Sequence, residues 1–149
     1  MYAHELFHIY QSSVAPRSRA EATVLLPLWH EGLATYVSGR LNLGVSDEQI
    51  LMDASLARLS QKDLAWLATE YLKIAERSAG ESALHEEWFA VGKLRLRENL
   101  PSRCGYRLGL DVIRRLAQEY SLFEMARWDH SQIAERVSQA LKFISRTEG

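Results

Sequence analysis

The sequence contains one cysteine, three prolines and eight glycines in 149 residues. A single cysteine, Cys104, excludes an internal disulfide and a thiolate zinc cluster, and it is most simply interpreted as a small buried residue in a reducing compartment. No apolar run approaches the roughly 20 residues of a membrane-spanning helix, and the first residues do not resemble a signal peptide. We therefore expect a cytoplasmic protein without a membrane partner.

The charges almost cancel, because 18 basic and 19 acidic side chains leave a formal net charge of -1. This balance gives no long-range field that would attract nucleic acid or anionic lipid. A chain of 149 residues with 47% hydrophobic content can bury one sizeable core but not two. We expect a single domain over residues 1–149, no nucleic-acid partner, and a substrate that is selected by local contacts.

The apolar residues repeat at helical rather than strand spacing, since few glycines and prolines interrupt them. Serine or aspartate followed three residues later by an acid or amide marks helix starts near residues 46, 60 and 129. Pro27 suits the first turn of a helix that would end at about Ser38, before Gly39. These patterns predict an all-α domain of about six to eight helices. The three clearest apolar stripes consist of Leu64, Leu67, Ala68, Tyr71, Leu72 and Ala75; Tyr106, Gly109, Leu110, Ile113, Leu116, Ala117 and Tyr120; and Ile133, Val137, Ala140, Leu141 and Ile144.

The first residues of the chain read His4-Glu5-Leu6-Phe7-His8. Residues four apart on a helix lie one turn above each other on the same face, so the two imidazoles can bind one metal ion. The Glu5 carboxylate flanks that face and can reach a water held by the metal. Zinc in hydrolases usually takes three protein ligands and leaves a fourth position for water. A third ligand must therefore come from elsewhere in the chain.

A second segment, Trp29-His30-Glu31-Gly32-Leu33-Ala34-Thr35-Tyr36, places a carboxylate on another predicted helix. Small residues surround Glu31, and small residues let two helices approach closely. A glycine inside a helix costs about 1 kcal/mol relative to alanine, so Gly32 needs a packing reason. We expect that reason to be close contact with the helix that carries His4 and His8.

The pair HELFH and HEGLA resembles the gluzincin group of zinc metallopeptidases, whose third ligand is a glutamate on a later helix. The sequence also resembles bacterial families of predicted zinc-dependent peptidases of unknown substrate, which share an HExxH helix, a W-x-EGLA-x-Y helix and a GY-x-x-G helix start. The last element is Gly105-Tyr106-Arg107-Leu108-Gly109 here. The resemblance spans roughly residues 1 to 145. It implies His4, His8 and Glu31 as zinc ligands, Glu5 as general base, and a peptide or protein substrate.

The sequence departs from the gluzincin pattern in two places. Thermolysin-like enzymes carry an aspartate four residues after the glutamate ligand to support a histidine ligand, whereas this chain has Thr35. His30 is a possible substitute for that support. Gluzincins also usually place a β-sheet before the HExxH helix, where it binds extended peptides. We therefore expect an N-terminally shortened relative that lacks the upstream sheet.

Two further residues have both a catalytic and a structural interpretation. Tyr106 is either a core tyrosine or, as the resemblance implies, the hydroxyl that stabilises the oxyanion of a tetrahedral intermediate. Arg103 is either a solvated loop arginine or a contact for the oxyanion or for a substrate carboxylate. Two alternatives also stand beside a peptidase for the whole chain. One is a metal-binding or interaction module without turnover, and the other is a structural helical domain in which the motif arose by chance.

Overall fold

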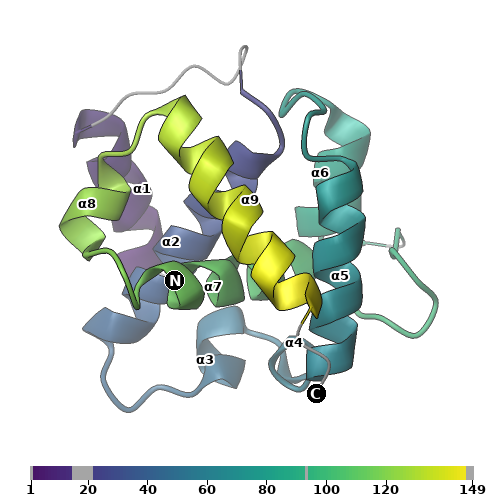
Figure 1. Cartoon of the computed structure of the whole chain (residues 1–149). Coiled ribbons are helices and arrows are strands. Elements are labelled where there is room, and N and C mark those ends of the chain that lie inside the picture. The colour runs from purple at the N-terminus through teal and green to yellow at the C-terminus, as the bar shows by residue number, and fades with distance from the viewer. Residues whose placement is uncertain (1, 15–21, 93, 147–149) are drawn as a thin grey trace.

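A computed structural model describes residues 2–14, 22–92 and 94–146 of the chain. All regular elements in these ranges are helices, and one isolated antiparallel bridge joins Thr23 to Ser78. The all-α prediction is confirmed, with nine helices in the described residues rather than six to eight, because three of them are single turns (Figure 1). The helices are α1 (Tyr2–Val14), α2 (Leu25–Leu41), α3 (Asp47–Leu51), α4 (Ala54–Ala57), α5 (Gln61–Lys73), α6 (Ser82–Phe89), α7 (Cys104–Leu116), α8 (Leu122–Ala126) and α9 (His130–Arg146).

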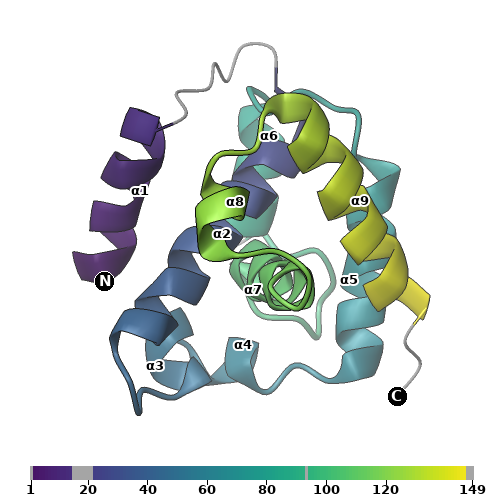
Figure 2. The same cartoon turned by 60° about the vertical axis from the view of Figure 1, so that its left-hand side comes forward.

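Helix α7 lies at the centre of the molecule. Figure 2 looks along its axis and shows the other helices arranged around it, with α2 on one side and α5 and α9 on another. The predicted stripe of α7 is buried at Leu110, Ile113 and Leu116, but Leu108 and Val112 outside that stripe are fully buried as well. Because helices pack on several of its sides, more of α7 is buried than a single amphipathic face would require.

The capping pattern in the sequence predicted three helix starts correctly. The Ser46 hydroxyl accepts from the Gln49 backbone, the Ser60 hydroxyl accepts from the Asp63 backbone, and the Asp129 carboxylate accepts from the Gln132 backbone. Pro27 lies in the first turn of α2, as predicted. The expected end of this helix was wrong, because α2 continues through Gly39 to Leu41.

Helices α2 and α7 approach each other closely at two glycines. A Cβ atom on Gly109 of α7 would lie 2.8 Å from the Leu28 carbonyl oxygen and 3.0 Å from the Gly32 Cα atom. A Cβ atom on Gly32 would collide with the backbone carbonyl of Gly109. The expectation that Gly32 contacts the helix of His4 and His8 is therefore wrong, because its close neighbour is α7. Gly32 lets α2 cross the central helix directly beside Glu31.

Replacing Gly32 with alanine is expected to destabilise the protein. The added methyl group meets backbone atoms of Gly109, which cannot rotate away, so the two helices must separate. The gain in helix propensity, about 1 kcal/mol, offsets only part of this cost. We expect a net loss of about 2 kcal/mol or more in the free energy of unfolding, measured by urea denaturation.

Gly39→Ala provides a matched control in the same helix. Its new methyl group would approach the Cδ1 atom of Ile50, the end of a flexible side chain, rather than backbone. We expect Gly39→Ala to be neutral or slightly stabilising. Equal unfolding free energies for both variants would contradict the proposed role of the crossing.

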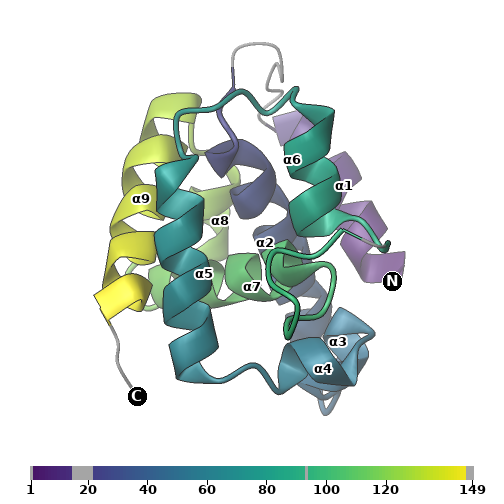
Figure 3. The ribbon, with the colours of Figure 1, turned by 90° about the vertical axis from the view of Figure 1, so that its right-hand side faces the viewer.

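Helix α1 lies on the outer side of α2, away from α5 and α9 (Figure 2). It buries Phe7 and Gln11 and leaves Leu6 and Ile9 exposed. Figure 3 shows α1, α3 and the N-terminal end of α7 on the same side of the molecule. None of the helices in the described ranges combines the length and apolar content needed to cross a membrane.

Candidate metal centre

Three side chains from α1 and α2 converge on one point. The Nε2 atoms of His4 and His8 lie 3.0 Å apart. The Glu31 carboxylate places one oxygen 3.2 Å from His4 Nε2 and the other 3.3 Å from His8 Nε2. The structure thus brings together the three residues that the sequence predicted as ligands, and they form a group that could hold a metal ion.

The spacing of these atoms can be compared with the geometry of zinc. Zinc bonds to nitrogen or carboxylate oxygen measure about 2.0–2.1 Å, so neighbouring ligands in a tetrahedral site lie about 3.3 Å apart. The two nitrogens lie 3.0 Å apart, and each lies 3.2 or 3.3 Å from a different oxygen of the Glu31 carboxylate, which is close to this value. Two imidazoles and one carboxylate are also a common set of protein ligands in catalytic zinc sites. The residues present therefore fit a metal ion such as zinc.

The electrostatics of Glu31 keep its carboxylate ionised. Burial opposes ionisation, but hydrogen bonds from His4 and His8 outweigh it and hold the pKa of Glu31 well below its usual range. Burial likewise lowers the pKa of His8, yet the adjacent Glu31 more than compensates and the pKa of His8 is raised. A negative oxygen thus lies beside two nitrogen atoms, an arrangement that attracts a cation.

A further layer of contacts orients His8. Its Nδ1 atom lies 2.9 Å from His30 Nε2 and 3.3 Å from Gln11 Oε1. His30 therefore takes the position that the sequence suggested as a substitute, whereas the Thr35 hydroxyl donates to the Glu31 backbone carbonyl at 2.8 Å. Such partners of a ligand's second ring nitrogen fix its tautomer and orientation. Gln11 was missed in the sequence, where its position three residues after His8 was the available signal.

Tyr106 and Glu5 lie at the edge of this centre. The Tyr106 ring centroid is 6.3 Å from that of His4. Burial and the negative charge of Glu31 raise the pKa of Tyr106 to about 12, so the hydroxyl stays protonated and can donate. Glu5 is exposed and lies beside His4 at the mouth of a pocket.

The pocket opens next to His4 and encloses about 70 Å³. Its walls come from α1, α2, the end of α3 and the start of α7. This space holds several water molecules or one side chain. The residues that line it are His4, Glu5, Thr35, Ser38, Ile50, Leu51, Met52, Arg103 and Tyr106.

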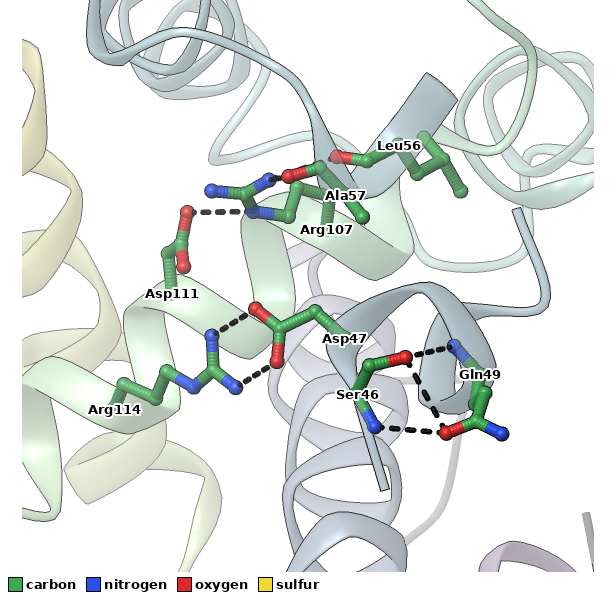
Figure 4. A network of polar contacts seen from close by, with 8 residues as sticks. All are labelled: Ser46, Asp47, Gln49, Leu56, Ala57, Arg107, Asp111 and Arg114. Atoms are coloured by element: carbon green, nitrogen blue, oxygen red, sulfur yellow. Dashed lines mark hydrogen bonds and ion pairs between the residues drawn. The ribbon is translucent and has the colours of Figure 1, made fainter. Parts of the chain in front are cut away.

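A network of polar contacts holds the α3–α4 segment against α7 (Figure 4). The buried Arg107 guanidinium donates to the carbonyl oxygens of Leu56 and Ala57, each at 2.8 Å, and pairs with Asp111. Arg114 donates to both carboxylate oxygens of Asp47 at 2.9 and 2.7 Å. These contacts fix the wall of the pocket that carries Ile50, Leu51 and Met52.

Cys104 and His85 belong neither to the group of three candidate ligands nor to the lining of the pocket. Cys104 is buried, and burial raises the pKa of its thiol to about 12, which agrees with a small core residue. His85 is exposed and stacks on Phe89. Arg103, in contrast, lines the same pocket as His4 and Tyr106.

Comparisons of the chain with protein-family models, with curated proteins and with solved structures find no match. The resemblance to gluzincins therefore stays a prediction that depends on the residues and their geometry.

Proposed function

We propose that this protein is a zinc-dependent peptidase in which His4, His8 and Glu31 hold the metal. The observation that supports the proposal is the convergence of two imidazole nitrogens and one carboxylate at 3.0–3.3 Å separations. A pocket with room for a side chain opens next to them. A purely structural cluster of buried polar groups would not require such a pocket.

When bound, zinc would supply a Lewis acid for the scissile carbonyl and make a nearby water more acidic. Glu5 acts as general base, because its carboxylate lies beside His4 and faces the pocket without being needed as a ligand. It takes a proton from the water as the water oxygen bonds to the carbonyl carbon. It then passes that proton to the leaving nitrogen as the C–N bond breaks, giving a carboxylic acid and an amine.

Tyr106 stabilises the negative charge that develops on the carbonyl oxygen when the water attacks. Its hydroxyl is protonated at neutral pH, and its ring lies 6.3 Å from the His4 ring at the edge of the metal centre. A donor that is in place before the reaction stabilises this oxygen without reorganisation.

The proposal is tested by measuring the zinc content of protein purified without added metal, together with hydrolysis of an unstructured peptide. We expect about one zinc per chain and cleavage that a chelator abolishes. Zinc without cleavage would favour the module without turnover. Negligible zinc would favour the structural domain with a chance motif.

Tyr106→Phe is expected to lower turnover by about 10² to 10³ with little change in the Michaelis constant. The substitution keeps the ring and its packing against Phe89 and removes only the hydroxyl. Steady-state kinetics on the peptide substrate and zinc content are the measurements. A purely structural tyrosine would leave both kinetic constants within about twofold of the parent, well below the 1.4 kcal/mol of a tenfold effect.

Tyr120→Phe is the matched control, because Tyr120 is half-buried against Trp128 and does not line the pocket. We expect its kinetic constants to equal those of the parent. Similar losses in both variants would assign the effect of Tyr106→Phe to stability rather than to the oxyanion.

A further inference from the structure

Two residues in the described part of the chain have a positive φ although they are not glycine. They are Met52, with φ 56°, and Arg103, with φ 64°. Left-handed backbone is unfavourable for residues with a Cβ atom, and such residues gather at functional sites. Both residues line the pocket beside His4. Glycine would adopt a positive φ at a lower free-energy cost at both positions. The presence of methionine and arginine there therefore indicates a role for their side chains.

The Arg103 side chain is held in place at the pocket. Its guanidinium donates to the Leu51 carbonyl oxygen at 3.2 Å and lies 4.7 Å from the centre of the Tyr106 ring. No carboxylate within the described ranges pairs with it. A guanidinium has five N–H donors, so most of them stay available for an anion. A fixed arginine also loses less conformational freedom when it binds a planar carboxylate.

The wall beside Arg103 is apolar. Ile50, Leu51 and Met52 form it, and Met52 is 53% exposed although it is a large hydrophobic residue. Methionine adapts its shape to different apolar partners. The pocket therefore offers an apolar surface and a cation side by side, with room for one side chain.

The pocket is short. The Tyr106 ring centre lies 4.7 Å from the Arg103 guanidinium carbon and 6.3 Å from the His4 ring centre. Since one extended residue spans about 3.5 Å, a group bound by Arg103 lies no more than about three residues from His4. An acidic group so close to the scissile bond, next to an apolar side chain, matches the C-terminus of a peptide.

We propose that this pocket binds the C-terminal end of the peptide substrate, with Arg103 pairing with the free α-carboxylate and the wall of Ile50, Leu51 and Met52 contacting an apolar terminal side chain. This inference rests on the proposed function, and it narrows the substrate to peptides with a free carboxylate end. Cleavage would release about one to three residues from the C-terminus.

The test uses two N-acetylated peptides of one sequence that end in Ala-Leu, one as the free acid and one as the amide. Their binding to the full chain is measured by titration in the presence of a chelator, which prevents turnover. We expect the free acid to bind at least about tenfold more tightly, because a charge-assisted contact is lost in the amide. Zinc content and hydrolysis are measured separately, so a chain that lacks zinc but prefers the free acid would refute only the proposed peptidase.

Arg103→Gly should reduce the preference for the free acid to within about twofold, while the thermal midpoint stays at or above that of the parent. Met52→Gly should weaken the binding of both peptides equally, and it should likewise keep the midpoint of thermal unfolding. Arg40→Gln, which removes the same charge from an exposed position outside the pocket, should keep the full preference.

Equal binding of the two peptides, no binding up to about 5 mM, or a preference that survives Arg103→Gly would overturn the inference. So would a large drop in the thermal midpoint of Arg103→Gly, because Arg103 would then serve the fold rather than the ligand.

Discussion

Replacing His8 with alanine is expected to remove nearly all zinc from the protein. His8 would supply one of the three proposed ligand atoms, since its Nε2 atom lies within 3.3 Å of both His4 Nε2 and the Glu31 carboxylate. Two remaining ligands hold zinc much more weakly than three. His30 cannot take its place, because His30 Nε2 contacts Nδ1, the ring nitrogen that is not directed at the centre.

Metal analysis after dialysis against a weak chelator measures this effect, with about one zinc per parent chain as the reference. His85→Ala is the matched control, since His85 is an exposed histidine on another helix and stacks on Phe89. We expect the control to retain its zinc. Helical circular dichroism of both variants shows whether the fold is kept. Equal zinc in His8→Ala and the parent would refute the ligand assignment.

The same metal would also join two helices, α1 and α2. His4 and His8 belong to α1, whereas Glu31 belongs to α2, and α1 buries few residues of its own. Because zinc binds only when both helices are in position, its binding free energy contributes to the docking of α1. The exposure of Leu6 and Ile9 makes this contribution important, since the outer face of α1 packs on no described element.

Features that depend on nearby residues could be predicted from the sequence. The capping residues Ser46, Ser60 and Asp129 each accept a hydrogen bond from the backbone three residues later. The predicted core stripe of α5 is buried at Leu64, Leu67 and Tyr71. The His4–His8 pair follows from the helical repeat alone. Glu31 needed α2 to be placed beside α1, and Gly32 was not a signal for that contact because it lies against Gly109 of α7.

Features that depend on tertiary contacts could not be predicted in this way. Gly32 was correctly singled out, but its partner Gly109 is distant in sequence, and only the crossing of α2 with α7 identifies it. The left-handed backbone of Met52 and Arg103 is equally invisible, since neither residue type indicates a positive φ. The pocket therefore emerges only from the structure, although Arg103 and Tyr106 were both candidates.

Glu5→Gln is expected to abolish most hydrolysis while the zinc stays bound. Glutamine keeps the size and shape of the side chain, but its amide cannot accept the proton of the attacking water. Glu5 is exposed and lies outside the group formed by His4, His8 and Glu31, so we expect its neutralisation to leave the three candidate ligand atoms where they are. We expect turnover to fall by about 10² to 10⁴ and zinc content to remain at the parental value.

Glu31→Gln is the control that separates a base from a ligand. A carboxamide binds zinc less well than a carboxylate, and the buried carboxylate of Glu31 also accepts hydrogen bonds from both histidines. We therefore expect this variant to lose zinc, and its activity to recover in part when zinc is added in excess. Activity of Glu5→Gln should not recover with added zinc, because the missing function is proton transfer. If Glu5→Gln cleaves the peptide at the parental rate, the general base is another group, and if it loses zinc as Glu31→Gln does, Glu5 belongs to the ligands.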